Sequence, residues 1–470
     1  MRFAINLGML RRIWKTLCAA VRGDEYDLTA IPISKALVLL AVPMMLEMAM
    51  ESIFALIDTY FVGKIGTGAL TTVGLTEVMM TLVYSLAIGL STAPMAMVAR
   101  FIGEKDPEQA GRAAGQAILL GVFVSVLIAV PGFLYADDLL RLMGASEEVV
   151  SQGAGYTRIM FATNVVIVLL FVINGIFRGA GEAARAMRVL WLANGINIVL
   201  DPLLIFGYGP FPELGVEGAA VATSIGRGVG VAYQLYLLFG KRSVVQPGAT
   251  VLRVEWPMQA RIVRIASSGA FQYLVASASW VFLMRIVASF GEEAVAGYTV
   301  SIRLLIFTML PAWGLASAAA ALVGQNLGAG EPDRAERSVW VALRVTIGYF
   351  LSLSFVYYFF AGALVQSFVA EAGAVAVGTE ALKLWALGYV FFGVGMIPVQ
   401  AFNGAGDTRT PLLVNLLCFW IIEIPLGYWL AQELSYGVRG VVWAVIAAEV
   451  LLSGLAIYLF SRGRWKQQTV

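Results

Sequence analysis

The chain has 470 residues, of which 60% are hydrophobic and only 13% are charged, whereas soluble domains have about 25% charged residues. This composition excludes an ordinary soluble enzyme, because too few polar groups are available to cover a soluble fold. The sequence has no histidine, which removes His-based triads and His–metal sites, and Cys18 and Cys418 form no CxxC pair. A net charge of +2 is too small to indicate nucleic-acid binding. The composition therefore predicts a polytopic membrane protein.

The first 30 residues mix basic and apolar side chains, as in the run RRIWK at 11–15. The apolar stretch is interrupted by charge and has no small-residue cleavage site, so we do not expect a signal peptide here. We expect an amphipathic helix that lies on the inner leaflet of the membrane. A disordered basic tail is the alternative.

A membrane-spanning helix needs about 20 mostly apolar residues, and twelve such stretches follow one another along the chain. The stretches are continuous and do not alternate in polarity, which excludes a β-barrel. The sequence thus predicts an all-α membrane protein with twelve transmembrane helices. The predicted spans are 33–62, 70–98, 112–135, 153–177, 187–207, 216–239, 262–289, 295–323, 339–368, 380–402, 411–431 and 438–460.

Lys and Arg residues between these spans are strongly biased toward one side of the membrane. If both termini are cytoplasmic, most of the basic residues face the cytoplasm. Basic residues accumulate on the cytoplasmic side of membrane proteins, so we predict a multi-pass protein of the cell (inner) membrane with both termini inside. Only Lys64, Arg141, Arg158, Lys383 and Arg439 then fall outside.

The two halves of the chain resemble each other. Residues 41–114 align without a gap with 266–339, and the same shift aligns FRGAGE at 177–182 with FNGAGD at 402–407. Each repeat contains six predicted spans, so the halves should be related by a pseudo-two-fold axis along the membrane normal, with a substrate path between them. The predicted parts are a cytoplasmic basic amphipathic segment 1–30, an N-terminal six-helix lobe 31–239, a cytoplasmic linker 240–261, a C-terminal six-helix lobe 262–461 and a cytoplasmic tail 462–470.

Three carboxylates lie within the first predicted span. Glu47, Glu51 and Asp58 are spaced by four and seven residues, which places them on roughly one helix face. Ionisable groups at membrane depth are costly and therefore mark candidate functional sites. The second half has no acid at the matching positions, which favours a task performed by the first half. The aligned residues there are Gln272, Ala276 and Leu283.

The fifth predicted span carries a second polar face. Asn194, Asn197 and Asp201 are spaced by three and four residues, and Asn174 and Thr223 on neighbouring spans could converge on them. Carboxylates, amide oxygens and a hydroxyl suit a proton or a hard cation such as Na⁺. Asp201, like Asp58, is more readily explained by function than by structure.

Other intramembrane carboxylates have a structural interpretation. Glu47, Glu77, Glu423 and Glu449 could each lie near a helix end or pair with a single arginine. For Glu51 a structural and a functional role are equally plausible.

The predicted architecture resembles that of the multidrug and toxic compound extrusion (MATE) family of cation-coupled exporters, from about residue 30 to 462. The resemblance implies a V-shaped bundle that alternates between outward-open and inward-open states and exports cationic amphiphiles against H⁺ or Na⁺ entry. It also implies no cofactor apart from the coupling ion, no ATP and a monomer. The matching segments are IDTYFVG at 57–63, RGAGE at 178–182, NIVLDP at 197–202, GAAVAT at 218–223 and NGAGDTRTP at 403–411.

The resemblance also assigns roles to individual residues. It is closest to the branch whose acidic coupling site lies in the N-terminal half, since the seventh span carries Gln272 where the other branch has an essential carboxylate. Glu51 departs from the family pattern and adds either a second proton site or a cation contact. The predicted coupling residues, with a possible Na⁺ site at the first four, are Asp58, Asn197, Asp201, Thr223 and Glu51. The predicted substrate-cavity residues are Asn174, Tyr156, Glu47 and Gln272.

Two other functions compete with a secondary-active exporter. A lipid-linked oligosaccharide flippase would line its cavity with Arg or Lys, but basic residues within spans are few. An intramembrane enzyme would need a nucleophile or metal motif, and the pair Asp137-Asp138 does not belong to an Asp-rich one. The Gly-rich segment 324–330 lacks the Gly-Lys-Ser/Thr of a phosphate loop, so ATP use is not expected.

Overall fold

The computed structural model describes residues 7–248 and 253–469, and every regular element in these two ranges is helical. The first half contains α1 (Leu7–Arg22), α2 (Ile33–Gly63), α3 (Thr67–Gly103), α4 (Pro107–Leu134), α5 (Ala136–Leu142), α6 (Glu147–Ala162), α7 (Asn164–Gly179), α8 (Ala183–Phe206) and α9 (Val216–Phe239). The second half contains α10 (Trp256–Ala288), α11 (Glu292–Gly328), α12 (Pro332–Gln366), α13 (Ala372–Gly404), α14 (Arg409–Asn415), the π-helical η2 (Leu416–Glu423), α15 (Ile424–Tyr428), the π-helical η3 (Trp429–Glu433), α16 (Val438–Ser461) and the 3₁₀ helix η4 (Arg464–Gln467).

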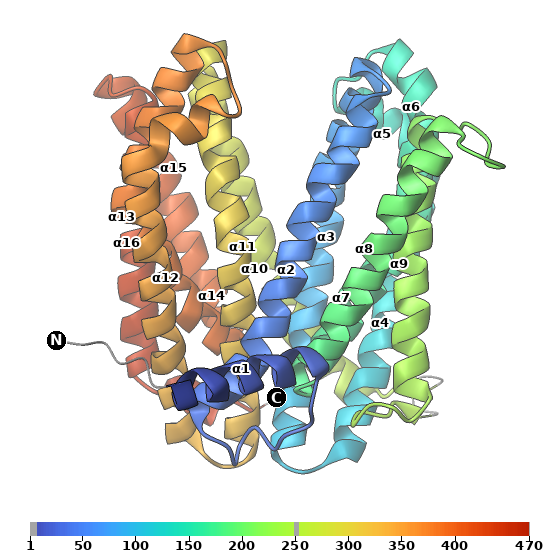
Figure 1. Ribbon diagram of the computed structural model, residues 1–470, viewed down its shortest axis with the longest axis vertical. Coiled ribbons are helices and arrows are strands. Elements are labelled where there is room, and N and C mark those ends of the chain that lie inside the picture. Colours follow the sequence, from blue (N-terminus) through green and yellow to red (C-terminus); the bar gives the residue numbers. More distant parts are fainter. Residues whose placement is uncertain (1–6, 249–252, 470) are drawn as a thin grey trace.

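The helices form two groups that diverge toward one end of the molecule and meet at the other (Figure 1). One group contains α2 to α9 and the other contains α10 to α16. The groups meet through two helix pairs, in which α2 packs against α11 and α3 packs against α10. We call the two groups the N-terminal bundle and the C-terminal bundle.

Small residues let the two bundles approach backbone to backbone where they meet. A Cβ atom on Gly89 of α3 would lie only 2.3 Å from the backbone nitrogen of Ala270 on α10. At the end of α3, a Cβ atom on Gly103 would lie 2.0 Å from the carbonyl oxygen of Gln325 on α11. Small residues at helix interfaces give this kind of close contact in membrane proteins.

Eleven helical segments in the described residues are long and apolar enough to cross a membrane. The predicted sixth span is also a helix, α9, which packs along α8. Its mean hydropathy is lower than that of the eleven candidate spans, so it is not one of them. Its sequence contains Glu217, Arg227 and several glycines, which lower its apolar content. The prediction of an all-α membrane protein is therefore confirmed, with eleven candidate spans in place of the twelve predicted.

Several helices differ from the predicted spans in length or continuity. The predicted fourth span is divided into α6 and α7 at Thr163, and the predicted eleventh span contains the two π-helical segments. Helix α10 begins at Trp256, within the predicted linker 240–261, because Pro257 favours the first turn of a helix and the basic residues that follow can face water. Residues 249–252 of this linker lie outside the described residues.

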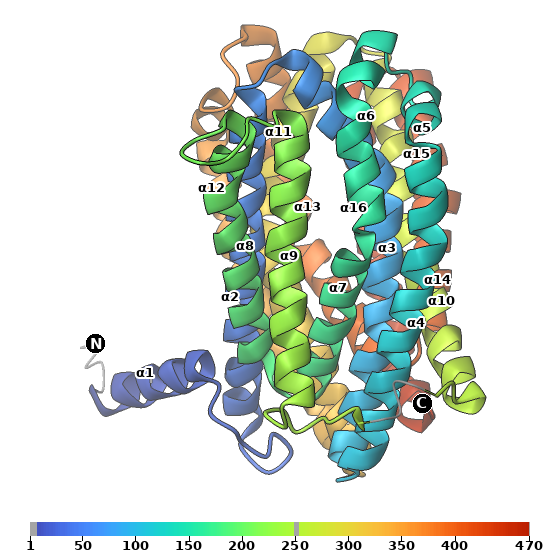
Figure 2. The same ribbon diagram turned by 90° about the vertical axis from the view of Figure 1, so that its right-hand side faces the viewer.

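Helix α1 lies across the end where the bundles meet, roughly at right angles to the long helices (Figures 1 and 2). Ala19 and Ala20 are buried against the rest of the protein, whereas Ile13, Val21 and Trp14 are exposed, Trp14 to 67%. Leu7–Arg22 of the predicted basic segment thus form a helix with exposed apolar side chains, residues 23–30 are not helical, and residues 1–6 lie outside the described residues. The structure argues against a disordered tail over Leu7–Arg22.

Candidate functional site

A hydrogen-bonded group of side chains surrounds Asp201 in the N-terminal bundle. Asp201 is completely buried, and Asn197 lies one turn earlier on the same face of α8. With its amide nitrogen toward Asp201, Asn197 donates to Oδ2 at 2.7 Å, and its amide oxygen accepts from the N–H and the hydroxyl of Thr223, each at 2.9 Å. This orientation satisfies both ends of the amide. The periodicity of α8 and its packing against α9 thus build the polar face predicted from the sequence.

Asp58 of α2 faces the same region. It is half-buried, and its carboxyl group is close enough to Asp201 for the two charges to interact. Tyr156 of α6 is buried and lies within electrostatic range of Asp58. Within residues 7–248 and 253–469, neither Asp58 nor Asp201 forms an ion pair with Lys or Arg. Four elements therefore contribute to this group, which we call the Asp58–Asp201 cluster: Asp58, Tyr156, Asn197, Asp201 and Thr223.

Glu51, the fifth predicted coupling residue, is already engaged. Its Oε2 accepts a hydrogen bond of 3.0 Å from Nδ2 of Asn194, and its Oε1 lies 3.5 Å from Nη2 of Arg227. Arg227 of α9 is buried, and its guanidinium carbon lies 5.6 Å from the centre of the Tyr84 ring. The positive charge of Arg227 compensates the negative charge of Glu51. Glu51 therefore adds little net negative charge to the site.

Glu47 belongs to a separate network toward the junction of the bundles. It is only 1% exposed, and its Oε1 accepts from Nη2 of Arg178 at 2.7 Å and from Nδ2 of Asn174 at 2.9 Å. The other end of the Asn174 amide accepts from Gln234 at 2.7 Å. The prediction that Glu47 pairs with a single arginine is confirmed. The assignment of Glu47 and Asn174 to a substrate cavity stays a prediction.

Gln272, the fourth predicted cavity residue, comes from α10 of the C-terminal bundle. It is buried, and within the described residues its Oε1 has no hydrogen-bond partner. The adjacent Tyr273 packs on Trp313 at 5.6 Å between ring centres and accepts from Nε2 of Gln400 at 3.2 Å. Gln272 therefore lies in a polar and aromatic region distinct from the Asp58–Asp201 cluster.

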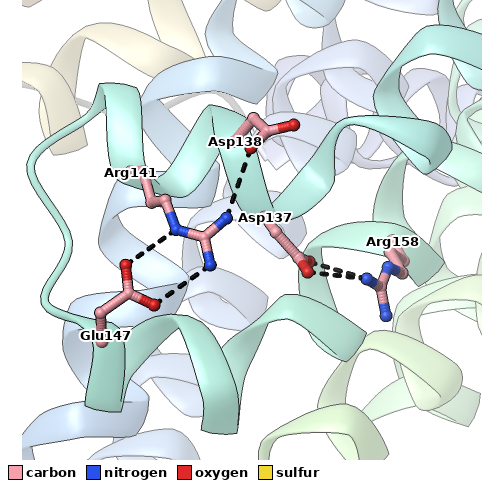
Figure 3. A network of polar contacts seen from close by, with 5 residues as sticks. All are labelled: Asp137, Asp138, Arg141, Glu147 and Arg158. Atoms are coloured by element: carbon pink, nitrogen blue, oxygen red, sulfur yellow. Dashed lines mark hydrogen bonds and ion pairs between the residues drawn. The ribbon is translucent and has the colours of Figure 1, made fainter.

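The pair Asp137-Asp138 takes part in ion pairs at the end of the molecule where the bundles diverge (Figures 1 and 3). Arg158 donates to both oxygens of Asp137, at 2.8 and 2.9 Å. Arg141 bridges Asp138 at 3.3 Å and Glu147 at 2.8 Å. Each aspartate is thus neutralised by an arginine, and no group of three His, Cys, Asp or Glu suited to a metal occurs in the described part of the chain.

Not every residue of this region was assigned to the site from the sequence. Arg227 and Tyr84 contact or approach the predicted site, and the only signal for Arg227 was an arginine at membrane depth.

Glu449 was expected near a helix end or beside an arginine, and this was wrong. It lies in the middle of α16, is 8% exposed, and within the described residues has no ion-pair partner. Its charge interacts with that of Glu423, which is also buried.

A comparison with known protein families shows to which family this chain belongs. The model of the MatE family matches residues 43–203 and 270–429, one segment in each half. The chain belongs to the MatE family. This MatE protein is a multi-pass membrane transporter and not an enzyme. The two matched segments also agree with the repeat seen in the sequence.

Individual relatives cover nearly the whole MatE protein. A probable multidrug resistance protein NorM of Thermotoga maritima is 27% identical over 93% of this chain and 94% of its own length. An FAD transporter of Shewanella oneidensis is 28% identical over 93% of this chain and 97% of its own. A solved structure described as the outward-facing conformation of a multidrug resistance MATE family transporter of the MOP superfamily has a TM-score of 0.86. It is 28% identical and covers 93% of this chain and 96% of its own.

Proposed function

We propose that this protein exports cationic, amphiphilic small molecules in exchange for an entering ion that binds at the Asp58–Asp201 cluster. The observation that carries the proposal is a pair of interacting carboxylates in an apolar bundle, neither of which forms an ion pair with Lys or Arg in the described residues, although the charge of Arg227 acts on Asp58 from a longer distance. Such groups attract cations, and the attraction grows as water is excluded. The family assignment and the names of the multidrug resistance relatives support this direction.

The coupling ion we propose is the proton. In the amide orientation that satisfies both ends of Asn197, its nitrogen faces Asp201, whereas Na⁺ would take the amide oxygen. The oxygens of Asp58, Asp201 and Thr223 are the remaining donors for Na⁺, which is the alternative. The acidic coupling site then lies in the N-terminal half, as in the branch of the family that the sequence resembles.

The proposed arrangement in the membrane has twelve spans, with α9 as the twelfth. The lobes are 31–239 and 262–461, related by a pseudo-two-fold axis along the membrane normal, and they alternate in access as a monomer. Both termini, the basic segment 1–30, the linker 240–261 and the tail 462–470 lie in the cytoplasm.

Transport in proteoliposomes tests the proposal. Vesicles with the purified protein are loaded with ethidium, and a proton or a sodium gradient is imposed, one at a time. We expect the proton gradient to drive ethidium movement in the wild type and both D58N and D201N to abolish it. D137N is the matched control, because it removes one carboxylate outside the spans. Wild-type transport by D58N and D201N, or equal loss in D137N, would contradict the assignment.

A second candidate substrate class is favoured by one contact. Nη1 of Arg227 is buried and has no hydrogen-bond partner within the described residues, so it could bind an anionic group. The Shewanella oneidensis relative is named an FAD transporter, and FAD carries two phosphates. Export of FAD, but not of ethidium, by the same vesicles would favour this class over the cationic one.

A further inference from the structure

Four arginines line one pocket at the end of the molecule where the bundles meet. The pocket lies between the end of α1, the first turns of α8 and the segment after α9. Its other lining residues include Tyr233 and Leu237 of α9, which supply an apolar wall. This pocket is separate from the Asp58–Asp201 cluster. The four arginines are Arg22, Arg185, Arg188 and Arg242.

The chain turns sharply after α1 and thereby places Arg22 beside α8. Gly23 has a φ of +71°, a conformation that favours glycine. A Cβ atom there would lie 2.9 Å from the Cβ of Ala184 and 3.0 Å from Nη2 of Arg188. A larger residue at this turn would therefore displace α1 from the pocket.

A second connection holds the segment after α9 against α8. Glu182 accepts from the hydroxyl of Ser243 at 2.6 Å and from the N–H of Val244 at 2.9 Å. Arg242 directly precedes these residues, and its guanidinium carbon lies 4.8 Å from the centre of the Tyr236 ring. These contacts fix the position of Arg242 at the pocket.

The charges in the pocket do not balance. Arg185 pairs with Glu182 and, at 3.2 Å, with Glu25. The other three arginines form no ion pair within residues 7–248 and 253–469, and Asp24 lines a neighbouring pocket. Arg22, Arg188 and Arg242 are exposed and water screens their charges, so these side chains are accessible to an anion that enters the pocket. Arginine binds phosphate oxygens with paired N–H donors, so a phosphate group fits this arrangement.

The surroundings of the pocket are those of a membrane surface. Helix α1 leads into it and exposes Trp14 and Val21, and Tyr236 and Phe239 are exposed at the end of α9. Apolar side chains beside a basic pocket suit a molecule with an anionic head and an apolar tail. Basic pockets between transmembrane helices bind anionic lipid headgroups in this way.

We propose that the pocket of Arg22, Arg185, Arg188 and Arg242 binds the phosphate of an anionic phospholipid, and that α1 lies on the same leaflet. The lipid bridges α1, α8 and α9 at the end of the N-terminal bundle. This inference does not depend on the transported substrate or on the coupling ion.

Lipid binding to the full-length protein tests the inference. The protein is purified in detergent, and phosphatidylglycerol, phosphatidylcholine or inorganic phosphate is added and detected by native mass spectrometry. R188Q/R242Q removes two charges from the pocket. R337Q/R462Q is the matched control, since it removes two exposed arginines elsewhere at the ends of α12 and α16.

We expect the wild type and R337Q/R462Q to bind phosphatidylglycerol equally and in preference to phosphatidylcholine. R188Q/R242Q should bind it roughly thirty-fold more weakly, or about 1 kcal/mol for each arginine. Unchanged binding in R188Q/R242Q, or an equal loss in the control, would overturn the site. Inorganic phosphate that competes with the lipid would show that a free anion is the ligand instead. If R188Q/R242Q fails to fold, R242Q alone, outside the helices, should bind about five-fold more weakly.

Discussion

The ion pair between Glu47 and Arg178 should contribute strongly to the stability of the N-terminal bundle. Replacement of Arg178 by Met removes the charge and keeps much of the side-chain length. Glu47 would then remain buried, at 1% exposure, with only the hydrogen bond from Asn174. A buried carboxylate without its counter-ion is unfavourable, so R178M should be markedly less stable than the wild type.

The expected magnitude follows from the geometry. Charges 2.7 Å apart attract by about 6 kcal/mol at an effective dielectric constant of about 20, and desolvation offsets part of this. Removal of one partner from a buried pair costs about 3–5 kcal/mol. Because Asn174 still donates to Glu47, we expect a value near the lower limit, about 3 kcal/mol. E47Q/R178M removes both charges and should recover at least half of that loss.

Equilibrium unfolding of the purified wild type, E47Q, R178M and E47Q/R178M in detergent measures these differences as a double-mutant cycle. R158M is the matched control, since its partner Asp137 is about one-third exposed and exposed pairs contribute about 1 kcal/mol or less. If R178M is as stable as R158M, or if the double variant is no more stable than R178M, the Glu47–Arg178 pair does not stabilise the bundle as reasoned.

E51Q frees Arg227 and adds one positive charge to the site, so affinity should fall about twice as much on a logarithmic scale for divalent as for monovalent cationic drugs. An equal increase in transport KM for divalent and monovalent drugs would contradict this. G89A should destabilise the protein by more than about 2 kcal/mol, because its Cβ would collide with Ala270, whereas G195A has open space and serves as control in thermal unfolding. Hydrogen bonding to Glu336 and the nearby Asp333 raises the pKa of Lys466. Its stabilisation is thus complete below the ordinary lysine pKa and disappears only as the pH rises through the raised value, so K466M should cost the same stability at neutral and mildly alkaline pH.

The sequence predicted the helices well because a membrane leaves few alternatives. Backbone groups in hydrocarbon must bond within the segment, so long apolar stretches become helices. The break at Thr163 and the π-helical segments were not predicted, because hydropathy reports how apolar a segment is and not whether its α-helix is continuous. The side chain of Thr163 bonds to the carbonyl of Ile159 and to Ser224, contacts that depend on packing.

The candidate site was predictable where helical periodicity defines it. Asn197 and Asp201 lie one turn apart on α8, and this alone places them side by side. Contacts between helices could not be predicted from spacing. The pairing of Glu51 with Arg227 and the isolation of Glu449 depend on which faces of distant helices meet, and one sequence does not specify this.

The close contact of Gly89 with the backbone of Ala270 bears on how the two bundles can move. Interlocked large side chains must change rotamers before one helix can slide past another, and each such change is a barrier. Backbones that meet over small residues present smooth surfaces, and a small rotation between them breaks few interdigitated contacts. We therefore expect that a rotation of one bundle against the other would displace the diverging ends by a large distance and the contact surfaces at the junction by only a small one.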